Sequence, residues 1–96
     1  MAEVRYLGKL REVTGVAQER VEGAQVGQLL GRLSKKHGPR LGELLFANGN
    51  VAELSQDVEV LVNGRDIDFL DGLGTDLGEK DRVTILYHGV RGFPGV

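Results

Sequence analysis

Charged and apolar side chains alternate along residues 3–7, which read Glu-Val-Arg-Tyr-Leu. This period of two predicts a strand with one buried face. Gly8 ends the clearest part of the pattern, and Leu10 is a candidate for its extension. Residues 18–22 predict a return strand with Val21 turned inward. Because the connection is longer than a two-residue turn, we expect a loose hairpin.

One helix stands out in the next stretch of the chain. Four apolar residues follow the spacing i, i+3, i+4, i+7, which places them on one helix face: Val26, Leu29, Leu30 and Leu33. Gly27 and Gly31 interrupt it, and since glycine costs a helix up to about 1 kcal/mol, we expect them to allow close approach to a sheet. The Gly-Pro pair at 38–39 predicts the helix end, and residues 41–46 predict a short helical turn or an irregular segment.

Alternation returns in the second half of the chain. Residues 58–62 read Val-Glu-Val-Leu-Val and predict a strand, and the Asn-Gly pair at 63–64 predicts a hairpin turn directly after it. We expect Ile67 and Phe69 in a short partner strand, and residues 82–87 in a last strand buried on both faces. The order β-β-α-β-β, without a linker, predicts an α+β fold in a single domain.

The composition limits the class of protein. The chain has 96 residues, enough for one modest core, and no cysteine, which excludes disulfides and thiolate metal sites. Lys and Arg number 12 against 14 Asp and Glu, and this net charge of −2 does not suit a nucleic-acid binder. No apolar run reaches the ~20 residues of a membrane helix, and no signal-peptide pattern is present. We therefore expect a cytoplasmic protein that binds neither nucleic acid nor membrane.

Candidate catalytic and metal-binding groups are few. His37 and His88 lack a second ligand at metal-binding spacing, and the serines lie in no nucleophile motif. Asp66, Asp68 and Asp71 flank a turn, where aspartate favours hydrogen bonds to its own backbone over acid–base chemistry. We expect a small binding or carrier protein that is not an enzyme and has neither catalytic residues nor a metal.

Five segments of the chain form a recognisable set, namely residues 4–15, 26–30, 60–67, 70–77 and 81–85. The third segment contains the Val-Asn-Gly strand end and the fourth the leucine-glycine turn before Thr75. Taken together, these segments resemble the MoaD/ThiS family of ubiquitin-like sulfur carriers. The resemblance extends over roughly residues 3–86 and implies a β-grasp fold, with a mixed four- to five-stranded sheet packed on one main helix. We expect this domain at residues 1–88 and a flexible tail at residues 89–96.

The resemblance also implies a function. An activating enzyme of the MoeB/ThiF type adenylates the C-terminal carboxylate with ATP, and sulfur then replaces one oxygen to form a thiocarboxylate. The thiocarboxylate supplies a sulfur-accepting synthase subunit in molybdopterin, thiamine or related pathways. The carrier itself binds no cofactor. Its tail must be narrow and extended, which is why family tails end in Gly-Gly.

The tail of this chain departs from that pattern. It reads Tyr-His-Gly-Val-Arg-Gly-Phe-Pro-Gly-Val, without a Gly-Gly pair. One interpretation is a precursor that a protease trims after Gly92 or Gly95. A second is a protein-interaction module or accessory subunit that has lost the carrier chemistry, with Phe93 and Pro94 docking in an apolar groove. A third is that residues 93–96 are foreign to the natural protein.

The resemblance and the tail together indicate which residues meet partners. We expect contacts on the exposed face of the sheet and along the tail. The activation candidates are Arg91, Gly92, Gly95 and Val96, and the partner-binding candidates are Phe69, Leu70 and Phe93. For Phe69 and Leu70 a place in the core is an equal alternative.

Overall fold

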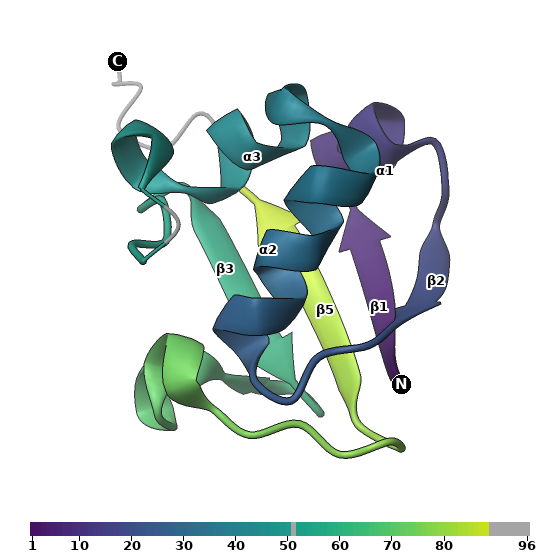
Figure 1. The fold of residues 1–96 in the computed structure, drawn as a ribbon, viewed down its shortest axis with the longest axis vertical. Coiled ribbons are helices and arrows are strands. Elements are labelled where there is room, and N and C mark those ends of the chain that lie inside the picture. Colours follow the sequence, from purple (N-terminus) through teal and green to yellow (C-terminus); the bar gives the residue numbers. More distant parts are fainter. Residues whose placement is uncertain (51, 89–96) are drawn as a thin grey trace.

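The computed structural model describes residues 1–50 and 52–88. Five strands form one mixed sheet in the order β2-β1-β5-β3-β4, and the helices cover one of its faces (Figure 1). The strands are β1 (Ala2–Leu7), β2 (Gln18–Val21), β3 (Val58–Val62), β4 (Arg65–Asp66) and β5 (Arg82–Tyr87). The helices are α1 (Lys9–Thr14), α2 (Val26–His37) and α3 (Pro39–Leu45), with 3-10 turns η1 (Ala47–Gly49), η2 (Ile67–Phe69) and η3 (Gly72–Gly74). The predicted α+β arrangement on one main helix is confirmed.

The core lies between α2 and the central strands. Burial alternates along β1, β3 and β5, so one side chain in two enters the core, as the sequence pattern predicts. The four predicted apolar residues of α2 are all fully buried. In β5, Val83 and Ile85 are buried whereas Leu86 is only partly so. The prediction of burial on both faces is therefore wrong, because the helices cover only one face.

The connection between β1 and β2 contains a helix that the sequence pattern did not predict. Leu10 does not extend the strand. It lies in α1, where it is the buried residue of the helix. Gly8 and Gly15 both have positive φ, of 61° and 79°, and they frame this helix. Gly15 also donates its backbone N–H to the Arg11 carbonyl, which closes the last turn. A six-residue helix with one buried anchor leaves no periodic signal to detect.

The helical segments that follow agree better with prediction. α2 ends at His37, where the Gly-Pro pair indicates, and the residue that follows, Gly38, has a φ of 97°. Pro39 then occupies the first turn of α3, so the same pair ends one helix and begins the next. Leu41 and Leu45 are buried, which confirms the short helical turn expected at 41–46.

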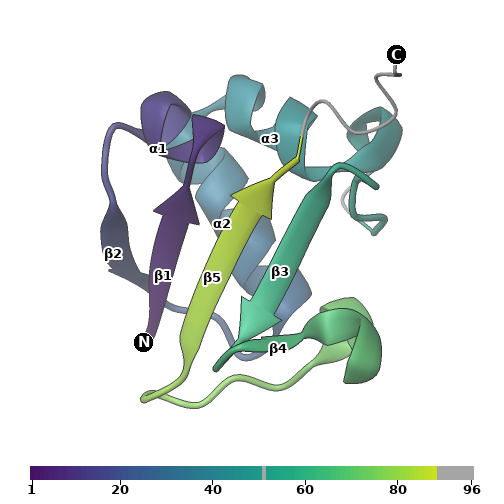
Figure 2. The ribbon, with the colours of Figure 1, turned by 180° about the vertical axis from the view of Figure 1, so that it is seen from behind.

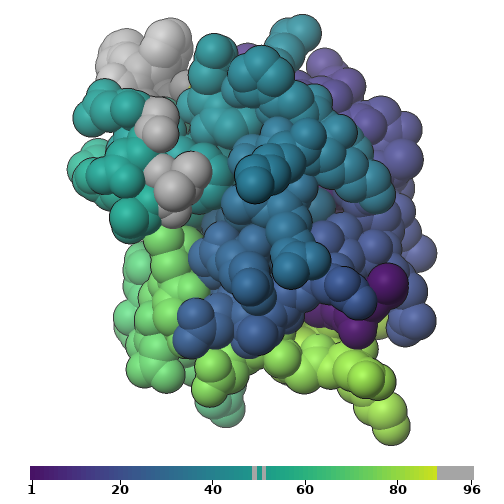
Figure 3. Space-filling model, in the orientation of Figure 1, coloured from purple at the N-terminus to yellow at the C-terminus, as the bar shows by residue number. Residues whose placement is uncertain are grey.

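The two helix glycines have different surroundings. A Cβ on Gly27 would lie 3.1 Å from the Leu73 carbonyl oxygen, so the close approach is to the turn η3 and not to the sheet. A Cβ on Gly31 would meet nothing within 4 Å. The prediction of sheet contact is therefore wrong for both. The loop at η3 is held against α2 because Val26 N–H donates to the Thr75 carbonyl at 3.0 Å. Figure 3 shows this segment, in green, packed beneath α2.

The hairpin after β3 is confirmed, but its second strand is shorter than predicted. Asn63 and Gly64 have positive φ, and β4 contains only Arg65 and Asp66. The Asp66 carboxylate then accepts the Asp68 N–H at 2.8 Å, which turns the chain into η2. The expected strand at Ile67 and Phe69 is wrong for this reason, although the interpretation of Asp66 as a turn residue is confirmed.

Asn63 also connects the hairpin to the start of β5. Its side-chain oxygen accepts the Arg82 N–H at 2.9 Å, and its Nδ2 donates to the Asp81 carboxylate at 2.9 Å. The Gly78 N–H and the Asn63 amide donate to that carboxylate and hold the pKa of Asp81 below its usual range. The segments with Val-Asn-Gly and with the acidic residue before the last strand thus meet in space.

Candidate functional site

The chain leaves the sheet from its centre. β5 lies between β1, with which it is parallel, and β3, with which it is antiparallel (Figure 2). His88 N–H donates to the Asp57 carbonyl at 2.6 Å, which extends the pairing with β3 one residue beyond Tyr87. The point from which the tail continues is therefore fixed by hydrogen bonds on a central strand.

The side chains at this exit are held on both faces of the sheet. On the helix side, Lys9 Nζ lies 5.6 Å from the centroid of the Tyr87 ring, a cation–π geometry worth roughly 0.5–1 kcal/mol at an exposed site. On the other side, His88 Nε2 lies 3.3 Å from Glu59 Oε1. Residues 87 and 88 are thus an anchored base for the segment that follows.

The face of the sheet opposite α2 carries no helix among the described residues, and Figure 2 shows it toward the viewer. We call it the open face; its residues are Glu3, Arg5, Leu7, Glu59, Leu61, Arg82, Thr84 and Leu86. Leu7 lies beside Leu86, which lies beside Glu59, near the tail exit. Arg82 Nε bonds Glu3 Oε1 at 3.0 Å at the far end. The open face therefore combines the adjacent leucines Leu7 and Leu86 with charged side chains on β1, β3 and β5.

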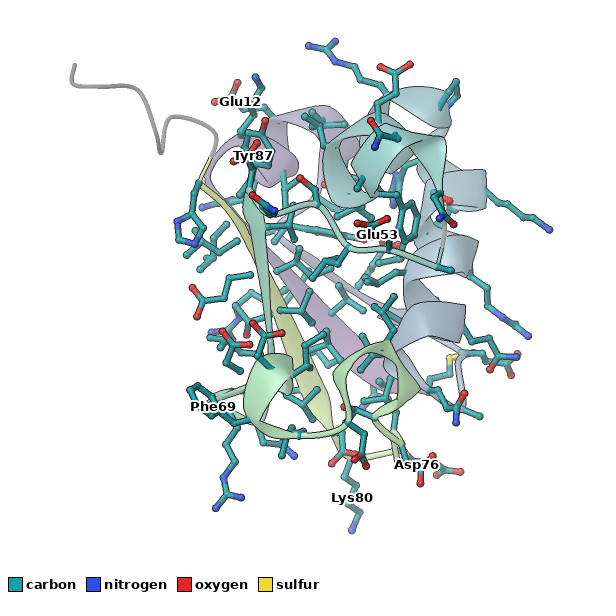
Figure 4. All side chains as sticks on the ribbon, turned by 90° about the vertical axis from the view of Figure 1, so that its left-hand side faces the viewer. Glu12, Glu53, Phe69, Asp76, Lys80 and Tyr87 are labelled. Carbon is teal, nitrogen blue, oxygen red and sulfur yellow. The ribbon has the colours of Figure 1, made fainter. Side chains whose placement is uncertain are left out.

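Phe69 lies at the margin of the open face, beyond β4. Its side chain is 87% exposed, so the alternative of a core position is excluded. It lines a groove of about 500 Å³ together with Leu61, Arg65 and Leu70. Leu70 is half-buried and packs against the core, so part of its surface belongs to the fold. Figure 4 shows Phe69 and Tyr87 toward opposite ends of the sheet, which separates this groove from the tail exit.

The remaining candidates belong to the tail. The activation candidates Arg91, Gly92, Gly95 and Val96 and the partner-binding candidate Phe93 lie outside the described residues. Of the residues proposed from the sequence, only Phe69 and Leu70 are therefore placed, and they lie side by side at the groove.

A cluster of polar side chains that no sequence pattern predicted lies between β2 and the end of α2. Glu19 accepts the Tyr6 hydroxyl at 2.5 Å, contacts His37 Nε2 at 2.6 Å and pairs with Lys36 Nζ. Partial burial raises the pKa of Glu19, but the hydrogen bonds from Lys36, Tyr6 and His37 outweigh it and lower the value to about 2. Burial, followed by the bond to Glu19, raises the pKa of Tyr6. The alternation of residues 18–22 could have indicated this cluster, because it places Glu19 on the same inward face as Val21.

Metal binding and membrane insertion find no support in the part of the chain that the structure describes. Residues 1–50 and 52–88 contain no group of three or more His, Asp or Glu side chains that could hold a metal ion. His37 and His88 each contact one carboxylate instead. The helices in these ranges are also too short or too polar to cross a bilayer.

The chain resembles known proteins over most of its length. Residues 4–88 match the family model of the ThiS family. The small archaeal modifier protein 3 of Haloferax volcanii is 32% identical in an alignment 88 residues long, and the match covers 86% of this chain and 89% of that protein. The family match includes all five strands of the sheet except the first two residues of β1.

Solved structures share the fold. The small archaeal modifier protein 1 of Methanosarcina acetivorans has a TM-score of 0.82 and 30% identity, and the match covers 90% of each chain. The BexX/CysO complex of Amycolatopsis orientalis contains a chain with a TM-score of 0.76 and 25% identity, with 91% of this chain and 94% of that chain covered. The predicted β-grasp fold is thus confirmed, and the chain belongs to the ThiS family of ubiquitin-like sulfur carrier proteins.

Proposed function

We propose that the protein carries sulfur on its C-terminal carboxylate. A carboxylate oxygen attacks the α-phosphorus of ATP on a MoeB/ThiF-type activating enzyme, and pyrophosphate leaves. A sulfur nucleophile then displaces AMP from the acyl adenylate, which yields the thiocarboxylate. The observation that carries this proposal is the exit of the chain from the central strand β5, beside an uncovered sheet face. Residues 87 and 88 give the tail a hydrogen-bonded starting point, and in this proposal the protein supplies no catalytic group or cofactor of its own.

The open face and the groove at Phe69 are the proposed docking surface for the activating enzyme. An exposed aromatic side chain beside Leu61 supplies the kind of anchor that carries much of the energy of an interface. On the same face Arg82 is paired with Glu3, and Arg5 adds positive charge that favours a partner with a complementary carboxylate. The His88–Glu59 contact lies between this surface and the tail. A bound enzyme would therefore meet the tail at a fixed starting point.

The tail sequence requires one further step in this proposal. A phenylalanine or valine at the terminus is wider than glycine and less able to enter a narrow channel, so we infer trimming to Gly92 or Gly95 by a protease. Sulfur then passes from the trimmed terminus to a sulfur-accepting synthase subunit in a molybdopterin, thiamine or related pathway.

A second candidate function uses the same activated terminus. The relative from H. volcanii is named a modifier protein, and an acyl adenylate or its thioester can be attacked by a lysine amine to form an isopeptide bond. This modifier function differs from sulfur transfer in its product. Lysine-linked remnants of the tail on other proteins would support it, and a terminal thiocarboxylate would support the carrier function.

The experiment that tests the carrier proposal is ATP–pyrophosphate exchange with the cognate activating enzyme. We compare the chains truncated after Gly92 and after Gly95 with the chain truncated after Phe93 and with the full-length chain. Exchange is expected with at least one of the two proteins that end in glycine, and at least about tenfold less with the proteins that end in Phe93 and Val96, since a bulky terminus costs binding energy in the channel. Absence of exchange with proteins ending at Gly92 and at Gly95 would contradict the proposal and favour a non-carrier interaction module.

A further inference from the structure

The outer edge of β2 has backbone groups with no partner strand. β2 is an outermost strand of the sheet and pairs only with β1. Tyr6 N–H donates to the Ala17 carbonyl at 2.9 Å, so these two residues form a hydrogen-bonded pair. Hydrogen-bonded pairs alternate with non-bonded pairs along an antiparallel ladder. The backbone N–H and C=O groups of Glu19 and Val21 therefore face β1. The N–H and C=O groups of Gln18 and Arg20 therefore point away from the sheet.

This edge is open to solvent. Gln18 and Arg20 are both exposed, and in the part of the chain that the structure describes no segment lies along the outer side of β2 (Figures 1 and 2). An exposed strand edge is a template for the addition of another extended segment. The edge can thus accept a sixth strand without displacing any described element.

Cations line both faces of this edge. Arg20 lies on the side of the open face and has no ion pair with a described residue, and its neighbour across the ladder, Glu3, bonds Arg82 instead. On the helix side, Arg32 and Lys36 reach toward β2, with side chains 50% and 55% exposed. The two carboxylates nearby are already engaged: Glu19 with three donors, and Glu22 with Arg32 at 3.5 Å. Arg32 and Lys36 are therefore themselves paired, and of these three cations only Arg20 has no carboxylate partner among the described residues. Three cations against two carboxylates leave a small excess of positive charge beside the unpaired backbone groups of the edge.

We propose that the outer edge of β2 binds an extended, acidic segment of a partner protein, which joins the sheet as a sixth strand. Backbone hydrogen bonds to Gln18 and Arg20 supply affinity, and the unpaired Arg20 side chain selects for carboxylates on the segment. A second copy of this chain is a poorer occupant, because pairing two such edges brings the same cations together. The site lies on the margin of the sheet opposite the Phe69 groove, so it can be occupied while the tail is in use.

Amide hydrogen exchange measured by NMR tests this proposal residue by residue. The probe is a short capped peptide of alternating Glu and Val, which can turn its carboxylates toward either face of the edge. In the free protein, the Gln18 and Arg20 amides should exchange much faster than the Glu19 amide, which is bonded to β1. On addition of the peptide, Gln18 and Arg20 should gain at least about tenfold protection while Glu19 is unchanged. A peptide of alternating Lys and Val is the control and should produce no protection.

Two variants separate backbone pairing from charge. Arg20→Pro removes an N–H that points away from β1, as edge strands tolerate, and should weaken peptide binding about fivefold to tenfold relative to Arg20→Ala. Arg20→Ala keeps the N–H and should lose only the contribution of one cation. The β1–β2 amide protection of each variant in the free state verifies that the sheet is intact.

Several outcomes would overturn the proposal. These are unchanged exchange at Gln18 and Arg20 with the acidic peptide, equal protection by the Lys-Val peptide, or Arg20→Pro binding as tightly as Arg20→Ala. Protection that rises with protein concentration in the absence of peptide would identify a second copy as the occupant. If Arg20→Pro does not fold, the alternating pattern of protection in the unaltered protein decides the question.

Discussion

Glu19 is a charged side chain whose place is set by its neighbours. Tyr6 is 1% exposed and needs an acceptor for its hydroxyl, and Glu19 supplies it while also holding Lys36 and His37 at the end of α2. Removing Glu19 leaves the Tyr6 hydroxyl without this acceptor. The carboxylate thus joins β2 to α2 and satisfies a core tyrosine.

The pKa of Glu19 gives this cluster a predictable pH dependence. The folded state lowers that pKa from the model-compound value of 4.5 to about 2, so the contribution to stability is complete above pH 4.5 and is lost as the pH falls toward 2. We expect Glu19→Gln to lower the free energy of unfolding at pH 7 by about 1–3 kcal/mol, measured by urea denaturation. The difference from the unaltered protein should shrink below pH 4.5.

The matched control for this prediction is Glu22→Gln. Its carboxylate is 65% exposed and lies 3.5 Å from Arg32, so the change should be within about 0.5 kcal/mol. If Glu19→Gln and the unaltered protein lost stability in parallel between pH 5 and pH 2, the assignment of the acid-sensitive contribution to Glu19 would be wrong.

Phe69 and Leu70 are neighbours in sequence with opposite roles. Phe69→Ala should change the free energy of unfolding by less than about 0.5 kcal/mol, because the ring is 87% exposed. It should raise the KM of the activating enzyme for the carrier about tenfold, as loss of an interface anchor does. Leu70→Ala should instead lower stability by about 1 kcal/mol or more, because its side chain packs against the core.

These two variants are compared by thermal unfolding and by steady-state adenylation kinetics on the same preparations. A loss of stability in Phe69→Ala similar to that in Leu70→Ala would show that the ring is packed. An unchanged KM in Phe69→Ala would place the docking surface elsewhere.

Among the elements, α2 contains two glycines, Gly27 and Gly31, at which alanine should affect stability differently. Gly31→Ala should raise the free energy of unfolding by about 0.5–1 kcal/mol, because alanine favours a helix and its Cβ meets nothing within 4 Å. Gly27→Ala should not, because its Cβ would press on the Leu73 carbonyl oxygen in a loop that hydrogen bonds tie to the helix. The free energy of unfolding is measured by chemical denaturation. Equal increases for the two variants would mean that the η3 loop moves away from a Cβ at position 27 at little cost.

The sequence patterns predicted the longer elements but not the shortest ones. Strands at 3–7, 58–62 and 82–87 and the helix from 26 were predictable because each has several periodic positions. α1 was not, because a single apolar residue, Leu10, anchors it. Nor was the early end of β4, because one carboxylate-to-backbone bond at Asp66 outweighs the strand preference of the residues that follow.

For the whole molecule, the sequence predicted the β-grasp fold but only part of the candidate site. The tail candidates rest on the resemblance and lie outside the described residues. Phe69 was proposed without knowledge of its exposure, which depends on where η2 leaves the sheet. The open face, the exit at His88 and the free edge of β2 follow from strand order, which no local pattern contains. These are the face, the centre and the margin of the sheet, where we propose that partners bind.

The central claim is that the C-terminus, trimmed to a glycine, carries sulfur. Intact-mass spectrometry of the protein isolated from its native cells tests it most directly. The account predicts a chain that ends at Gly92 or Gly95, part of which has the mass increase of an oxygen-to-sulfur exchange at the terminus. A single species that ends at Val96, with no sulfur-containing form, would contradict it.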